Sequence, residues 1–394
     1  MLWIEGYCAG KPLSFLDYHI RCGNSVVGVA DLDSLLDGVP KEAFSADDKE
    51  VKKQVITLNK KALDDAHLVQ NGKKQGMNVS LFTSDFTMQS IDSEQIGLAN
   101  KVREIAALPE DTLEQQVIKQ HRWEDLMRSP RVECLRLVCD IYTYSFYKQF
   151  TSSDIESHVD ETGKFTAFNI PYTRTVYQAL QEIKYLDDPD DEPDAQHLPD
   201  TLRREATDSA ATHRYFHWCV EFPEVFAYDG GFDVMCGNPP WDKLQMEEEK
   251  WFAGKDEDIV NAPNQAARKK RIAALEQSNP MLYAEFIAAG QSIASESSFV
   301  KNSGRFPLTA IGKLELSSLF AELCLSFSKE AWGLVLPTGI AVNDSNKAFF
   351  SKLVDENRLM SLYDFENREG LFDIHRMFKF CLLTAGKAQA EPRT

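Results

Sequence analysis

The chain has no apolar run of eighteen or more residues, no Cys-x-x-Cys pair and no secretory leader. Without a long apolar run, the sequence predicts no membrane span. The first residues lack both a basic region and a long apolar stretch, which excludes a signal peptide. The eight cysteines are scattered, which argues against a zinc site and favours reduced thiols in a cytoplasmic protein. We therefore expect no metal.

Positive charge is also scarce, because the formal net charge is −18. Residues 238–394 hold 19 Lys and Arg against 21 Asp and Glu, whereas residues 1–237 hold 24 against 40. Such a balance is unusual for a protein that binds nucleic acid, and most of the acid lies in the first part. The densest acidic run, residues 187–194, is typical of a solvated linker.

The sequence Asn238-Pro239-Pro240-Trp241 directly follows the apolar run 232–237. The two prolines cannot donate to a strand ladder, and a residue before proline is pushed out of the helical region. The pattern predicts a strand that ends in a stiff loop. The Asn238 side-chain oxygen and the Pro239 carbonyl can accept from an exocyclic amine, and Trp241 can stack on the attached ring. This set of groups suits the binding of a planar amine.

Helical periodicity dominates from about residue 40 to residue 150 and returns at 172–186 and 199–218. Residues 13–29 contain a short apolar strand that ends in a Gly-Asn-Ser turn. After residue 230 strands and helices alternate. The predicted strands are 232–237, 333–337, 360–366 and 378–384, and the predicted helices are 244–277, 281–298, 313–328 and 345–356, the last with Ser345 as N-cap.

This alternation is typical of a doubly wound α/β sheet. Ligands of such sheets bind beyond the carboxyl ends of the strands. If the strands 232–237 and 333–337 are parallel, Asn238 and Pro337 lie at that same edge. A cluster of four basic residues at 268–271 can contact phosphates, or it can be an exposed charged helix face.

Several segments together resemble the adenine-specific (N6) DNA methyltransferases of restriction–modification and phage-defence systems. Asparagine or aspartate followed by Pro-Pro and an aromatic is typical of their catalytic loop. The resemblance covers roughly residues 1–30 and 213–385. The matching segments are residues 10–28 (GKPLSFLDYHIRCGNSVVG), 216–218 (FHW), 221–226 (EFPEVF), 304–309 (GRFPLT), 333–337 (GLVLP) and 376–380 (RMFKF).

The resemblance implies methyl transfer from S-adenosyl-L-methionine to an adenine flipped out of double-stranded DNA. Asn238 and Pro239 would bind the N6 amine, and Pro240 would stiffen the loop. Trp241 would stack on one face of the base, and Phe378 or Phe380 would pack against the other. The alternative for the two phenylalanines is ordinary core packing, because residues two apart on a strand share a face.

The cofactor side departs from the family pattern. The family needs a glycine-rich turn against the methionine part of the cofactor, yet no two of the 20 glycines are separated by a single residue. The remaining cofactor element is Gly23-Asn24-Ser25, where Asn24 would contact the adenine of the cofactor; an ordinary Gly-Asn turn is the alternative. We therefore expect an incomplete cofactor pocket.

The expected fold is a partial Rossmann-like sheet of class I methyltransferases with a large helical insert. Residues 1–30 would be the remnant of the cofactor-side half, 31–212 the insert and 213–394 the catalytic half. The chain looks truncated at both ends. A second chain could supply the missing cofactor loop and the target-recognition domain.

Three functions remain open at this stage. The first is an adenine-N6 DNA methyltransferase with little activity as an isolated chain. The second is a catalytically inactive DNA-binding or assembly subunit of a defence complex. The third is methylation of a protein glutamine, against which the long helical insert and Trp241 argue, because tyrosine is the usual aromatic there.

Overall fold

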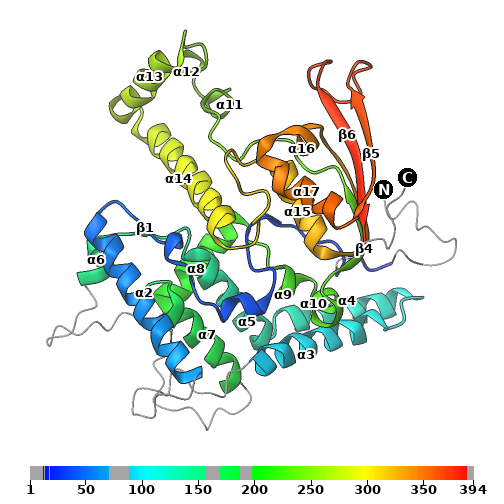
Figure 1. Ribbon diagram of the computed structural model, residues 1–394. Coiled ribbons are helices and arrows are strands. Elements are labelled where there is room, and N and C mark those ends of the chain that lie inside the picture. Colours follow the sequence, from blue (N-terminus) through cyan, green and yellow to red (C-terminus); the bar gives the residue numbers. More distant parts are fainter. Residues whose placement is uncertain are drawn as a thin grey trace. The chain divides into compact units, whose positions relative to one another are not determined.

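The computed structural model describes residues 12, 14–16, 18–70, 88–156, 169–186 and 198–387. The chain divides into two compact units, residues 1–231 and 232–394, and each is described by itself. The protein is mixed α/β, rich in helix, with two small sheets (Figure 1). The acidic run 187–194 lies outside the described residues. Among the helices described, none is long and apolar enough to cross a membrane.

The first unit is almost entirely helical, as the periodicity predicted. Its two-residue strands β1 (Ser45–Ala46) and β2 (Gln149–Phe150) pair in parallel. Its helices are η1 (Leu32–Leu35), η2 (Lys41–Ala43), α2 (Lys49–Gln70), α3 (Met88–Ala106), α4 (Leu113–Met127), α5 (Pro130–Tyr144), α6 (Ser152–Glu156), α7 (Thr173–Tyr185), α8 (Asp200–His213), α9 (Trp218–Glu221) and α10 (Pro223–Asp229).

Helix α5 is the buried centre of this unit. Pro130 occupies its first turn, where a missing N–H costs nothing. Its C-terminal half is buried almost all round, including the polar Asp140 and Thr143. It packs against α7 and α8. A helix that is buried on every side needs partners for its polar groups. Thr143 donates to the Cys139 carbonyl (2.8 Å), and Asp140 pairs with His217.

The prediction of a strand within residues 13–29 is wrong. The described residues there form turns and one isolated bridge, between Asn24 and Tyr215. Residues 26–29 are nevertheless buried, because they run against residues 214–219. Val29 N–H donates to His217 Nδ1 (3.0 Å). Since Nδ1 accepts, the ring proton is on Nε2, which donates to Asp140 Oδ1 (2.9 Å).

The second unit contains a four-stranded sheet in the order β3-β4-β6-β5. Strands β3 and β4 are parallel, whereas β6 is antiparallel to both β4 and β5. All four strands were predicted near their observed positions. The elements are β3 (Phe232–Gly237), α11 (Glu248–Phe252), α12 (Glu257–Val260), α13 (Gln265–Ser278), α14 (Pro280–Asn302), α15 (Leu316–Phe327), β4 (Ser328–Pro337), α16 (Gly339–Val342), η5 (Asp344–Asn346), α17 (Lys347–Asp355), β5 (Leu359–Glu366) and β6 (Lys379–Gly386).

Helices α15, α16 and α17 cover one face of this sheet (Figure 1). Alternate residues of β4 and β6 point into the core they share, including Leu334, Leu336 and Leu383. Phe349 of α17 is fully buried against them. A second, smaller core joins α11, α12, α13 and α14 around Phe252.

Two helix predictions in this unit need correction. Residues 244–277 form three short helices instead of one, since Gly254 adopts φ +74° and Pro263 lies between α12 and α13. Ser345 is not an N-cap. Helix α17 follows the short η5 turn, with Asn346 at the cap position and no side-chain cap bond. The Asn346 amide donates instead to the Gly339 carbonyl (3.1 Å).

Buried Glu322 of α15 fixes the segment 304–309 that carried part of the family resemblance. One carboxylate oxygen accepts from Leu308 N–H (2.9 Å), and the other accepts from Thr309 N–H (2.8 Å) and Thr309 Oγ1 (2.6 Å). Burial raises the pKa of this carboxyl, and the three donors oppose the rise. The carboxylate thus ties an irregular segment to the helix.

Glu322→Gln tests this anchor. An amide would direct N–H groups at N–H donors, so we expect the free energy of unfolding to fall by about 1–3 kcal/mol. Urea unfolding of both proteins measures the change. The control is Glu276→Gln, an exposed position on α13, with an expected change within roughly 0.5 kcal/mol. Equal stability of Glu322→Gln and the parent protein would contradict the anchor.

Candidate functional site

The carboxyl ends of β3 and β4 meet at one edge of the sheet. The strands are parallel, with Cys236 opposite Gly333 and Gly237 opposite Leu334. Asn238 therefore follows β3 at the same edge at which β4 ends in Pro337, as predicted. On the other side of β4, Phe380 near the start of β6 pairs with Pro337. This is the edge where α/β sheets place their ligands.

The Asn238-Pro239-Pro240 loop presents acceptor groups to solvent. Asn238 and Pro240 are exposed, and Pro239 is partly buried. With the described residues, the Asn238 amide makes no hydrogen bond, so its oxygen can accept from a ligand. The loop is stiff because both prolines have a fixed φ. Such a loop holds its acceptors in place without the entropic cost of ordering a flexible segment.

Trp241 is held on both its polar and its apolar side. Its indole Nε1–H donates to the Val335 carbonyl of β4 (3.2 Å). Its ring stacks on Phe378 (centroids 5.6 Å apart, planes 13° apart) and on Phe380 (6.1 Å, 27°). The structure thus brings together the three aromatic residues that the sequence analysis assigned to base stacking. Trp241 is partly exposed, so it is not sealed in the core.

The stacked rings of Trp241 and Phe378 leave no space for a base between them. A planar base between two rings needs about 7 Å, twice an ordinary van der Waals separation. The 5.6 Å between the two centroids is too short for that. Phe378 is 37% exposed, whereas Phe380 is 5% exposed and stacks on Phe365. Phe378 is therefore the ring that can move, and Phe380 is the fixed one.

Sequence reasoning missed three residues at this edge. Phe372 contacts both Trp241 (4.9 Å) and Phe380 (5.1 Å). Thr338, directly after β4, donates through Oγ1 to the carboxylate of Asp364 on β5. The sequence signal that could have found Phe372 was an aromatic residue between two predicted strands. The Thr338–Asp364 pair had none, since only the strand order brings the two residues together.

Two buried cysteines of the second unit, Cys324 and Cys381, are not activated nucleophiles. Burial raises the pKa of Cys324 to about 12 and, with the charge of Asp364, the pKa of Cys381 to about 11. Both thiols stay protonated at neutral pH, and a thiol is a weak nucleophile compared with its thiolate. The arrangement suits binding and orientation of a ligand rather than covalent catalysis through these two residues.

Gly23 and Asn24 lie in the first unit, in a packed turn. A Cβ on Gly23 would lie 2.6 Å from Phe216 Cδ2, so close packing requires the glycine. Asn24 N–H donates to the Arg214 carbonyl (2.7 Å), and its Oδ1 lies 3.4 Å from Val26 N. These contacts account for both residues without a ligand. Their cofactor role stays a prediction.

The basic cluster at 268–271 is split by the fold. Arg268 is buried, pairs with Glu249 (2.6 Å) and donates to the Ile259 carbonyl (3.3 Å). Lys269 and Lys270 are exposed. Arg271 is exposed and donates to the Asp258 carbonyl. Arg268 is thus a structural residue and not a phosphate contact.

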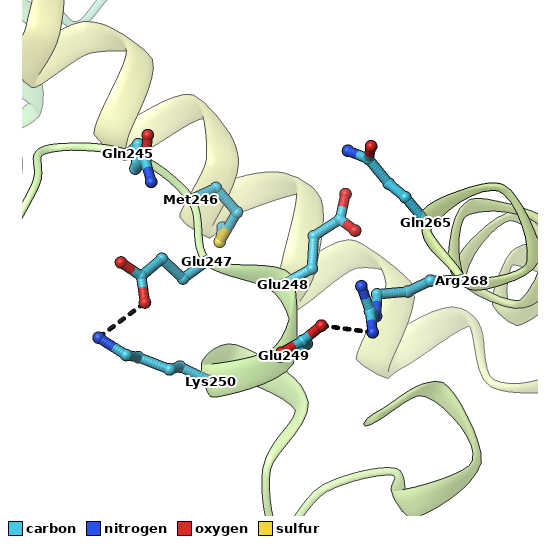
Figure 2. Close-up of a pocket in the computed structure, with 8 residues that line it drawn as sticks. All are labelled: Gln245, Met246, Glu247, Glu248, Glu249, Lys250, Gln265 and Arg268. Atoms are coloured by element: carbon cyan, nitrogen blue, oxygen red, sulfur yellow. Dashed lines mark ion pairs between the residues drawn. The ribbon is translucent and has the colours of Figure 1, made fainter. Parts of the chain in front are cut away.

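A cavity of about 380 Å³ lies beside Arg268 (Figure 2). The ion pairs Glu249–Arg268 and Glu247–Lys250 (2.7 Å) cross its wall. Its lining residues are Gln245, Met246, Glu247, Glu248, Glu249, Lys250, Gln265 and Arg268. Three carboxylates against two cations do not suit a phosphate. The described residues contain no cluster of His, Cys, Asp or Glu that could hold a metal.

Comparison with protein families matches residues 80–304 to the Eco57I restriction-modification methylase. Neither the curated proteins nor the solved structures gave a match. The matched range covers more than half of the chain and includes the Asn238–Trp241 loop. The match defines a methylase of a restriction–modification system, a class that acts on DNA. The chain belongs to the Eco57I restriction-modification methylase family.

Phe378→Ala tests the aromatic arrangement independently of any activity. Removal of the ring that stacks on Trp241 exposes the indole, so acrylamide should quench Trp241 fluorescence more readily. The Trp241 signal is obtained as the difference from the matching Trp241→Phe protein. Leu371→Ala is the control, because this side chain is 74% exposed on the same loop. Unchanged quenching in Phe378→Ala would contradict the stack.

Proposed function

We propose that this protein belongs to the adenine-N6 class of restriction–modification methylases. The observation that carries the proposal is the position of Asn238-Pro239-Pro240-Trp241 at the carboxyl edge of two parallel strands. A free side-chain amide, a stiff proline loop and an aromatic cluster there suit a planar base with an exocyclic amine. In this proposal residues 213–394 are the catalytic half of a Rossmann-like domain, 31–212 a helical insert and 1–30 part of the cofactor side.

In the proposed mechanism the target adenine leaves the duplex, because its amine is engaged in base pairing. Asn238 Oδ1 and the Pro239 carbonyl accept the two N6 hydrogens. These bonds fix the orientation of the amine, so its lone pair points away from both acceptors. Trp241 packs on one face of the base. Since Trp241 and Phe378 are in direct contact, Phe378 moves aside as the base enters and then closes on its second face.

The class takes its methyl group from S-adenosyl-L-methionine. We expect the described residues to form only part of its pocket, because Gly23 and Asn24 serve a packed turn and the sequence has no Gly-x-Gly turn. In the second unit, β3 is an edge strand of the sheet. We propose that a second chain completes the donor side; the cofactor role of Gly23 and Asn24 stays a prediction.

A catalytically inactive DNA-binding or assembly subunit is the second candidate. One observation favours it: the sequence has no Gly-x-Gly turn. Under this alternative the base pocket persists without methyl transfer. The two candidates differ in whether any arrangement of partners restores activity.

Asn238→Ala tests the catalytic assignment. The assay is tritium methyl transfer to unmethylated plasmid DNA, with and without the product of the neighbouring open reading frame. Loss of one acceptor of the amine should lower the rate by roughly 10²–10³-fold, as for a positioned hydrogen-bond group in other active sites. Asn238→Asp keeps an acceptor oxygen and should retain more activity than Asn238→Ala.

The control for this series is Asn261→Ala, an exposed asparagine after α12, which should leave the rate unchanged. Activity of Asn238→Ala above a few per cent of the parent would count against the assignment. Absence of transfer by the parent under every condition would favour the inactive subunit.

Calorimetry with S-adenosyl-L-methionine tests the donor side separately. We expect the isolated chain to bind it weakly, with a Kd well above the micromolar range, because the glycine-rich turn is absent. Addition of the completing chain should tighten binding. Micromolar binding by the isolated chain would show that its donor pocket is already complete.

A further inference from the structure

The connection between β5 and β6, residues 367–378, exposes an unusual amount of apolar surface. Leu371 is 74% exposed, Met377 72% and Ile374 40%. The two strands and their connection extend beyond α16 and α17 (Figure 1). Single exposed apolar residues are common, but three on one short connection are typical of an interaction site.

Hydrogen bonds of Asn367 fix the backbone of this connection. Asn367 is fully buried, and its amide donates to the carbonyls of Phe372 (2.9 Å) and Ile374 (3.2 Å). Its oxygen accepts from Phe372 N–H (3.1 Å), and its own N–H donates to the Phe378 carbonyl (2.9 Å). Gly370 provides the turn with φ +70°. The apolar side chains are thus presented from a fixed backbone.

The connection is continuous with the candidate base site. Phe372 and Phe378 contact Trp241, and each directly follows one of the two most exposed residues, Leu371 and Met377. One segment therefore turns two rings toward Trp241 and two flexible apolar side chains toward solvent. A partner that reaches Trp241 with a base meets Leu371 and Met377 at the same time.

The segment 366–379 carries mixed charge, with Arg368, Arg376 and Lys379 against Glu366, Glu369 and Asp373. Arg376 and Lys379 are exposed, and His375 lies beside them. Arg368 is exposed as well, although it pairs with Glu366 (2.7 Å). The apolar side chains suit the base stack of a duplex, and the exposed Arg376 and Lys379, which flank Met377 and Phe378, can contact its phosphates.

We propose that Leu371 and Met377 form a wedge that enters the DNA base stack next to the target adenine. This inference rests on the proposed function and extends it to the step that opens the duplex. The two side chains occupy space left by the extruded base, while Arg376 and Lys379 contact the flanking phosphates. Unstacking a base step is unfavourable, and apolar wedges offset this cost in other DNA-bending proteins.

Permanganate mapping on random-sequence duplexes tests the wedge without knowledge of the recognition site. Permanganate oxidises unstacked thymine, so it marks the thymine left opposite an extruded adenine. The parent protein, together with the product of the neighbouring open reading frame, should create reactive thymines at a recurring sequence. The double variant Leu371→Ala/Met377→Ala should lower that reactivity roughly tenfold. Met281→Ala, an equally exposed apolar position on α14 (75%), is the matched control and should leave it unchanged.

A second measurement separates duplex opening from ordinary contact. Fluorescence anisotropy compares the parent and the double variant on duplexes that carry an adenine opposite an abasic site. These duplexes are already open, so both proteins should bind them within about twofold. Equal loss of binding on open and paired duplexes would overturn the wedge in favour of a simple surface contact.

The remaining outcomes are also decisive. Undiminished thymine reactivity in the double variant would overturn the wedge and leave the proposed function intact. If the parent protein produces no reactive thymine yet methylates DNA, the wedge is overturned alone. If it produces neither signal when the product of the neighbouring open reading frame is present, the proposed function and the wedge fall together.

Discussion

The parallel pairing of β3 with β4 is the constraint on which the candidate site depends. It places Asn238 at the sheet edge where β4 ends. It also brings the Trp241 indole within hydrogen-bond distance of the Val335 carbonyl (3.2 Å). Val335 and Pro337 in turn pair with β6, and the rings of Phe378 and Phe380 at its start then meet Trp241. One strand register thus assembles acceptors and aromatic rings from segments more than a hundred residues apart.

The hairpin formed by β5, β6 and their connection completes the aromatic cluster and also limits access to it. Phe378 lies against Trp241, so the base has to displace it, and the backbone that carries Phe378 also presents Met377 to solvent. Entry of a base and contact of the hairpin with a duplex are therefore coupled through one segment. Buried Asn367 bonds to both sides of that segment, which favours movement of the hairpin tip as one body.

Much of the second unit could be predicted from sequence. Strand periodicity and the Asn-Pro-Pro stop located β3, and Trp241, Phe378 and Phe380 were assigned together before their contacts were known. Phe372 was missed because its position depends on hydrogen bonds from Asn367, which no local pattern reports. The Thr338–Asp364 pair depends on strand order alone.

The errors arise where contacts outside the local sequence decide the structure. The apolar residues 26–29 look like a strand, but their backbone groups bond to a neighbouring coil and to His217. Ser345 has the right residue type for an N-cap, but a short η5 turn takes that place. The sequence left phosphate contact and an exposed helix face open for Arg268, but α13 turns it inward onto Glu249. In each case tertiary contacts decided between local alternatives.

The central claim is that the loop at Asn238 holds the exocyclic amine of adenine for methylation. Mass spectrometry of nucleosides tests it most directly, on DNA from a methylation-deficient host that expresses this chain with its neighbouring genes. The account predicts N6-methyladenine, and predicts its loss when the chain is deleted. N4-methylcytosine in place of N6-methyladenine, or N6-methyladenine that persists without this chain, would contradict it.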